Sequence, residues 1–187
     1  VLKNIQNHGR ESLLQIGFPT KDLESWRLTD LEQFGKILKL PLFTEDKNTC
    51  EINSSEWPHP PQDGIRIILE SQNKKSELIN LPSGFRELTS NELQEFLTNS
   101  LNQDMSSKED ITLAINQATT KDVLALKVEG DNLPPLELIM PVNENILNPT
   151  RVIIILEEKA KLELLQIALG SGCSAHSHLL EIHLNKG

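Results

Sequence analysis

Apolar residues near the N-terminus recur at mixed spacings of three and four positions, the spacing that forms one face of a helix. This pattern covers residues 12–16 and again residues 23–40. Thr29 and Glu32 have the spacing of a capping box, so we expect a helix to begin at Thr29. Pro41 ends this helical section, because proline lacks the backbone donor that would continue a helix.

A polar, turn-rich stretch with several prolines follows over residues 44–64. Prolines remove backbone donors and favour extended conformations, so this stretch predicts a linker or a long surface loop. The β-branched run over residues 65–69 predicts a short strand. Two further helices are predicted where a capping-box pair precedes apolar residues that share a helical face. These pairs are Thr89 with Glu92 and Ser106 with Glu109.

The hydrophobic period changes from helical to strand-like after residue 120. Ala160, Leu162 and Leu164 alternate with their neighbours, and residues 180–184 repeat the alternation. A period of two with one apolar face predicts a half-buried sheet. We expect five short strands, over residues 123–128, 136–140, 152–156, 160–169 and 178–184.

Five strands with no long helix between them favour a sandwich, a barrel or a β-helix. No strict repeat is visible, so the periodicity alone does not choose among these folds. The chain therefore divides into three expected parts of an α+β protein. They are a helical region with a linker over residues 1–64, a strand with capped helices over 65–120, and a strand-rich part over 121–187.

Composition limits the classes of function. The chain has 187 residues, of which 37% are hydrophobic, enough for one sizeable domain or two small ones. Its formal net charge of −9 argues against nucleic acid or an anionic membrane as a partner, since both attract basic surfaces. No apolar run approaches the roughly 18 residues that a membrane span needs. Cys50 and Cys173 are too few for a disulfide framework, which favours a reducing, cytoplasmic setting.

The ends of the chain are unusual. It begins at Val1 without a charged leader and an apolar core behind it, and it ends directly after an expected strand. We therefore expect a fragment or a partly ordered chain.

Four residues near the C-terminus have side chains that bind zinc or iron: Cys173, His176, His178 and His183. In a strand, His176 and His178 share one face while His183 takes the other, which argues against one metal ion bound by all four. A surface loop or strand face is the favoured interpretation. The alternative is a metal site with Cys173, His176 and His178 as ligands, in a small β-sheet metalloenzyme.

The sequence lacks the motifs of common enzyme classes. It has no glycine-rich phosphate loop, no His-Glu-x-x-His and no Gly-x-Ser-x-Gly. Cys50 has no activating histidine or helix N-terminus beside it, so a catalytic thiolate is not expected there. We interpret Glu24, Trp26 and Arg27 as packing, capping or an ion pair, with a binding patch as the alternative.

One stretch has an order of residues that local physics does not require. Residues 19–29 read Pro-Thr-x-x-x-Glu-x-Trp-x-x-Thr. This order resembles a signature near the N-terminus of the SufD family (SufB/SufD family) of iron–sulfur cluster assembly proteins. Segments within residues 111–139, 148–154 and 180–184 resemble later stretches of the same family, in the same order. Leu28 departs from the pattern, because the family often has an aromatic residue there.

The resemblance implies an N-terminal helical domain followed by a right-handed parallel β-helix and a C-terminal helical domain. This sequence would then supply the N-terminal portion, with residues 121–187 as the incomplete start of the β-helix. The family's members are scaffold subunits of the SUF complex and act with SufB and the ATPase SufC. ATP hydrolysis is expected in SufC, so no catalytic residue and no cofactor are expected in this chain, and the complex would handle the iron–sulfur cluster.

The family's contacts and site residues lie mostly beyond the part that matches. SufC binds through a C-terminal region that has no counterpart here, and no functional residue of the family can be carried onto a position in this sequence. The resemblance implies a location in the cytoplasm or the plastid stroma. A homodimeric interaction module is a further alternative, because SufD-like β-helices self-associate.

Overall fold

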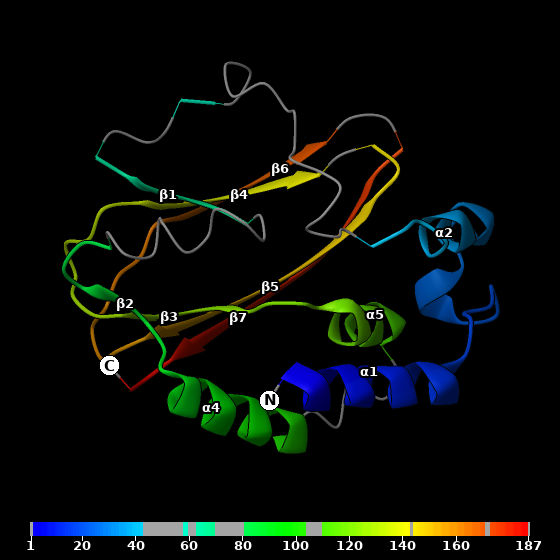
Figure 1. The fold of residues 1–187 in the computed structure, drawn as a ribbon, viewed down its shortest axis with the longest axis horizontal. Coiled ribbons are helices and arrows are strands. Elements are labelled where there is room, and N and C mark those ends of the chain that lie inside the picture. The colour runs from blue at the N-terminus through cyan, green and yellow to red at the C-terminus, as the bar shows by residue number, and fades with distance from the viewer. Residues whose placement is uncertain are drawn as a thin grey trace.

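The computed structural model describes residues 2–42, 58–59, 63–69, 81–103, 110–142, 144–170 and 173–186. It is an α+β protein, in which two facing sheets lie above a layer of helices (Figure 1). The helices are α1 (Leu2–Ile16), the 3-10 turn η1 (Glu24–Trp26), α2 (Leu31–Ile37), α4 (Ser90–Gln103) and α5 (Ile111–Thr119). The strands are β1 (Ile65–Ile68), β2 (Phe85–Glu87), β3 (Leu124–Val128), β4 (Leu136–Val142), β5 (Leu147–Leu156), β6 (Leu164–Gly170) and β7 (Ala175–Leu184).

The chain passes back and forth between the two sheets. One sheet has the order β1-β4-β6, and the other has the order β2-β3-β5-β7. All neighbours are parallel except β2, which runs antiparallel to β3. From β3 to β7, each strand therefore lies in the sheet opposite to the strand before it. The five strands expected after residue 120 and the strand at 65–69 are all confirmed, with shifted ends.

The parallel pairs among β3–β7 share one register. Leu124 pairs with Val152 and Leu147 with Ala175, and β4 pairs with β6 at the same separation, which is 28 residues, as between Thr150 and His178. The sequence shows no strict repeat at this distance. What repeats is the inward or outward orientation of each position, since the pleat places alternate side chains on opposite faces.

The main core lies between the two sheets. Alternate residues of β3, β4 and β5 face inward and are buried together. These inward residues are Leu124, Leu126 and Val128 of β3, Leu136, Leu138 and Met140 of β4, and Val152 and Ile154 of β5. Ile67 of β1, the strand next to β4, joins them, and an ion pair between Arg66 and Glu137 also ties β1 to β4.

The half-buried sheet predicted from the alternation is only partly right. Residues 160–165 alternate in exposure as expected, but all seven residues of β4 are buried, so both faces of this strand are shielded from solvent. Conversely, the side chains of Ile182 and Leu184 are 49% and 75% exposed, although their positions on β7 belong to the face that points toward the core between the sheets. β7 is the edge strand of its sheet, so no further strand covers them.

A second core lies between the outer face of the β2-β3-β5-β7 sheet and the helices. Ile5 of α1 and Leu97 of α4 pack with Ala125 and Ile153 of the sheet. The backbones of α1 and α5 approach closely at Gly9, where an added Cβ would lie 2.8 Å from the carbonyl oxygen of Ala114. Only glycine fits this contact without a shift of one helix.

Two of the predicted helix starts need correction. The residue that caps α2 is Asp30 and not Thr29, since its Oδ1 accepts hydrogen bonds from the backbone of Glu32 and Gln33, each at 3.0 Å. The helical pattern over residues 23–40 contains two elements, η1 and α2, so the expected second helix is present and begins one residue after its cap at Asp30. The cap of α5 is Asp110, whereas Ser106 and Glu109 lie outside the described residues.

The start of α4 is confirmed as a capping box. The backbone N–H of Thr89 donates to Glu92 Oε2 at 2.8 Å, and the backbone N–H of Glu92 donates to Thr89 Oγ1 at 3.3 Å. Most of the linker expected over residues 44–64 lies outside the described residues. Among the helices of the described part, none has both the length and the apolar character needed to cross a membrane.

Candidate functional site

A cleft of about 300 Å³ lies between α2, the N-terminal turn of α5 and the beginning of β7. Its walls are mainly apolar, with Phe34 and Ile37 on the α2 side and Leu113 on the α5 side. Asp110, Asn116, His176, Ser177 and His178 add polar groups. The backbone N–H of Leu147 donates to the carbonyl of Pro41 at 3.0 Å, which attaches the end of the α2 segment to β5 beside the cleft.

Asp110 holds the first turn of α5 in place. Its Oδ1 accepts hydrogen bonds from the Thr112 hydroxyl at 2.6 Å and from the backbone N–H groups of Thr112 and Leu113 at 2.8 and 3.2 Å. Burial raises the pKa of Asp110, but these hydrogen bonds outweigh burial and leave the pKa below its ordinary value. The carboxylate at this edge of the cleft is therefore ionised and engaged by its own helix.

Asn116 joins α5 to two strands at once. Its Nδ2 donates to the carbonyl of Thr150 on β5 at 3.0 Å and to the carbonyl of Ser177 on β7 at 2.6 Å. Its Oδ1 accepts from the hydroxyl of Thr120 at 3.1 Å. Because Asn116 is only 1% exposed, loss of these bonds would leave buried backbone carbonyls unpaired.

His178 connects the two sheets. Its Nδ1 lies 2.7 Å from Thr150 Oγ1 on β5, and its Nε2 lies 2.6 Å from Gln166 Nε2 on β6. The amide nitrogen of Gln166 can only donate, so His178 Nε2 accepts and the proton is on Nδ1, which donates to the threonine. Both ring nitrogens are thus in use in a neutral imidazole. Burial lowers the pKa of His178, and the charge of His176 lowers it further.

His176 is partly buried near the start of β7. Within the described residues, Nδ1 and Nε2 of its ring are shielded from solvent and make no hydrogen bond of normal geometry. Burial lowers the pKa of His176, and an interaction with the Leu169 backbone opposes this only in part. The shielding of its ring nitrogens from water thus favours the neutral form of His176 over the charged form.

The structure brings together only two of the residues considered for a metal site. His176 and His178 both line the cleft, on one face of β7 as predicted. Cys173 is exposed and is not among the residues that line it, and His183 lies on the opposite face against the ring of Phe96, at 4.4 Å between centroids. In the described part of the chain, no three His, Cys, Asp or Glu side chains are grouped closely enough to hold a metal ion. Cys50 lies outside the described residues.

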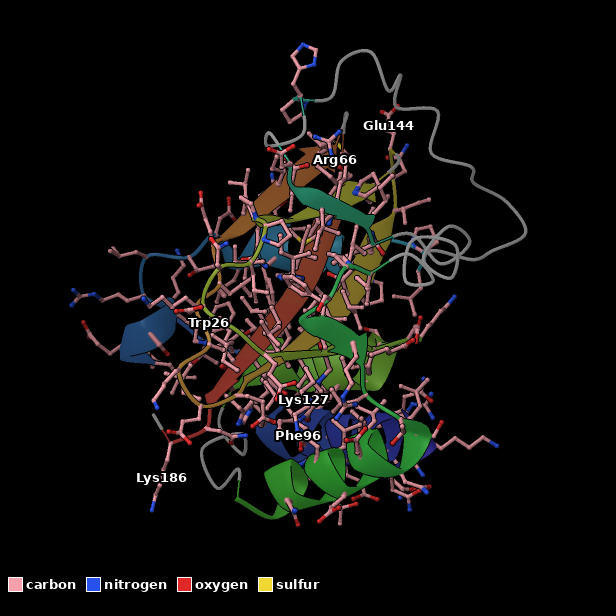
Figure 2. All side chains as sticks on the ribbon, turned by 90° about the vertical axis from the view of Figure 1, so that its left-hand side faces the viewer. Trp26, Arg66, Phe96, Lys127, Glu144 and Lys186 are labelled. Carbon is pink, nitrogen blue, oxygen red and sulfur yellow. The ribbon has the colours of Figure 1, made fainter. Side chains whose placement is uncertain are left out.

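The N-terminal motif, residues 19–29, lies outside the lining of the cleft. Trp26 packs against Phe34 with ring centroids 4.9 Å apart, and Figure 2 shows it at the periphery of the molecule. Arg27 and Glu24 form the exposed ion pair that the sequence suggested, at 3.4 Å. Such a pair contributes little stability, so the motif is a packing and pairing unit in this structure.

Sequence reasoning missed Asn116, Thr150 and Gln166. Asn116 sits inside a helix where polar residues are usually exposed, and its partners are 34 and 61 residues away. One signal was available: an asparagine among apolar neighbours in Ile111–Thr119 is typical of a buried side chain with backbone partners.

Comparison with known proteins does not identify the site, since the chain matches no protein-family model, no curated protein and no solved structure.

Proposed function

We propose that this chain is the N-terminal part of a SufD-like scaffold subunit, which assembles iron–sulfur clusters together with SufB and the ATPase SufC. The observation that carries the proposal is the common separation of 28 residues in both parallel ladders. A chain that alternates between two sheets and adds to each at a constant interval has the connectivity of a β-helix. The right-handed β-helix of the SufD family is therefore the fold we propose for residues 121–187.

The edges of the two sheets support a continuing stack. β6 and β7 are edge strands, and the bond between Gln166 and His178 joins them at one end of the stack. Edge strands exposed to solvent usually carry lysine, proline or inward charges that prevent pairing. β6 has no charged residue and β7 has a single carboxylate, Glu181, which is already paired with Arg151. We propose that the next turn of the β-helix pairs here.

The cleft favours a structural role over catalysis. The polar groups of Asp110, Asn116 and His178 hold α5, β5, β6 and β7 together through hydrogen bonds to backbone groups and to nearby side chains, among them Thr150 and Gln166. A catalytic base needs a nitrogen or oxygen that is free to take a proton from a substrate, and both ring nitrogens of His178 are already paired. A scaffold needs only the fixed geometry that these bonds provide.

The test is purification of the complete protein from its host through an affinity tag on its gene. We expect SufB and SufC to co-purify in stoichiometric amounts and to remain bound in gel filtration. An unrelated tagged protein from the same host is the control. If neither partner is retained at micromolar protein concentrations, the scaffold proposal is wrong.

A metal assay separates this proposal from a metalloenzyme. We expect the purified chain to contain no stoichiometric metal after gel filtration, and a His176→Ala, His178→Ala double variant to have the same metal content. A metal present at one equivalent in the parent chain and lost from the double variant would contradict the scaffold proposal. Elemental analysis by mass spectrometry measures both.

A further inference from the structure

Asp110, which lines the cleft beside α5, has an oxygen that its own helix does not use. The three hydrogen bonds that it accepts, from the Thr112 hydroxyl and from the backbone of Thr112 and Leu113, all end on Oδ1. Within the described residues, Oδ2 accepts no hydrogen bond and faces no cation. The carboxylate is ionised at neutral pH, because its hydrogen bonds outweigh its burial. The lining of the cleft therefore includes an unpaired negative oxygen.

The walls of the cleft are apolar and incompletely covered. Phe34 and Ile37 of α2 line it, and neither is buried, since Ile37 is 37% exposed. Leu113 of α5 and Leu179 of β7 also line it and are half-buried. The volume of about 300 Å³ is at the lower end of the range for ligand pockets. A small molecule with an apolar body would displace water from all of these side chains.

The charges around the cleft select the class of ligand. In the described part of the chain, no residue that lines it carries a positive charge, because burial lowers the pKa of His176 and His178 and leaves both neutral at pH 7. An anionic ligand would meet Asp110 without a counter-charge, on a chain with a net charge of −9. A ligand that offers no donor would remove water from Asp110 Oδ2 and leave this oxygen unpaired. An ammonium group avoids both penalties, since it donates to the free oxygen and is attracted by its charge.

We propose that the cleft binds a small organic amine, with its apolar body against Phe34, Ile37 and Leu113 and its ammonium group on Asp110 Oδ2. This proposal does not depend on the SUF assignment, because it rests only on the lining of the cleft. The bound amine would pack between α2 and α5. Since no residue of α2 is buried in the structure, the ligand would also fix the position of this helix.

Titration of the full chain with phenethylamine at pH 7, followed by NMR of the backbone amides, tests the proposal. Phenethyl alcohol and phenylpropionate are matched probes that carry the same ring with a neutral or a negative end. We expect the amine to bind with a dissociation constant on the order of a millimolar and to shift the amide signals of Thr112, Leu113 and Ser177. The alcohol should bind several-fold more weakly, and the acid more weakly still. Equal binding of amine and alcohol, or no shift at these amides with the amine, would overturn the proposal.

Asp110→Asn separates the charge from the helix cap, because the amide oxygen of asparagine accepts the same backbone hydrogen bonds. It should weaken binding of the amine about fivefold and leave binding of the alcohol unchanged. Asp30→Asn is the matched control, since Asp30 caps α2 through Oδ1 in the same way but does not line the cleft. We expect this control to bind the amine like the parent chain. Equal weakening by both variants would overturn the proposal, because it would assign the attraction to the net charge of the chain.

Discussion

At the scale of single residues, the side chains with the largest consequences are those that bridge elements. His178 touches both sheets, and Asn116 touches a helix and two strands. Arg151 is buried under the helices, with a side chain 2% exposed, and its Nη2 donates to Glu181 at 2.6 Å. Each of these groups was removed from water on folding, so its contribution depends on keeping its partner.

The two cleft histidines predict a pH dependence of stability. Burial lowers the pKa of His176 and His178 below 6.5, so the unfolded chain binds more protons than the folded chain in the range just below pH 6.5. The free energy of unfolding should therefore be highest above that pH and fall as pH drops from 6.5 toward 5. Urea unfolding at several pH values measures this.

The double variant His176→Gln, His178→Gln is the control for that titration. It should lose most of the pH dependence between 6.5 and 5, since the carboxylates with shifted pKa values titrate below that range. An unchanged slope in the variant would contradict the assignment to these two histidines.

The buried Arg151–Glu181 ion pair should make the free energy of unfolding sensitive to a single substitution at Glu181. Glu181→Gln leaves the Arg151 guanidinium buried without its counter-charge, which should reduce the free energy of unfolding by about 3 kcal/mol. Glu24→Gln breaks an exposed pair with Arg27 and should cost less than about 0.5 kcal/mol. Chemical denaturation of both variants compares them. Equal losses would contradict the burial argument.

At the scale of elements, helix boundaries follow local hydrogen bonds closely. The capping box at Thr89 and Glu92 was predicted from spacing and is present at the start of α4. The hydrogen bond from Arg86 lowers the pKa of Glu92 to about 2, and the backbone and side chain of Thr89 lower it too. The carboxylate thus keeps its capping role at neutral pH and loses it only as pH falls from about 4.5 toward 2.

Thr89→Ala should reduce the free energy of unfolding by about 1 kcal/mol, because the backbone N–H of Glu92 at the helix start loses its acceptor, Thr89 Oγ1. Thr98→Ala is the matched control on the same exposed helix, where the hydroxyl only donates back to the Gln94 carbonyl at 2.8 Å. We expect the control to stay within about 0.5 kcal/mol of the parent. Thermal and urea unfolding should rank the two variants in this order, and the reverse order would contradict the cap.

At the scale of the whole molecule, strand position in the stack sets local stability. Residues 152–156 of β5 are paired on both sides, by β3 and β7, whereas among the described strands β6 and β7 each have one free edge. Backbone N–H groups that point to a free edge exchange with solvent more readily than those in a ladder.

Hydrogen exchange should therefore be fast for about half of the amides in β6 and β7 and slow in residues 136–139 of β4 and 152–156 of β5, which are paired on both sides. In the complete protein, the proposed next turn should protect the fast amides. Equal protection of β5 and β7 in the present chain, at concentrations where it is monomeric, would contradict the open-edge description. Exchange measured by NMR resolves the individual amides.

The sequence by itself determined the type of most elements, because hydrophobic period and caps are local. The run at 65–69 and the Thr89–Glu92 box predicted their own segments correctly, whereas the alternation at Ala160–Leu164 matches the exposure of these residues but not a strand, since β6 begins at Leu164. Only the tertiary structure decided which strands pair, at what register, and which faces are covered on both sides. The contacts of Asn116 and His178 join residues 12 to 61 positions apart, and a local pattern carries no information about partners that chain folding brings together.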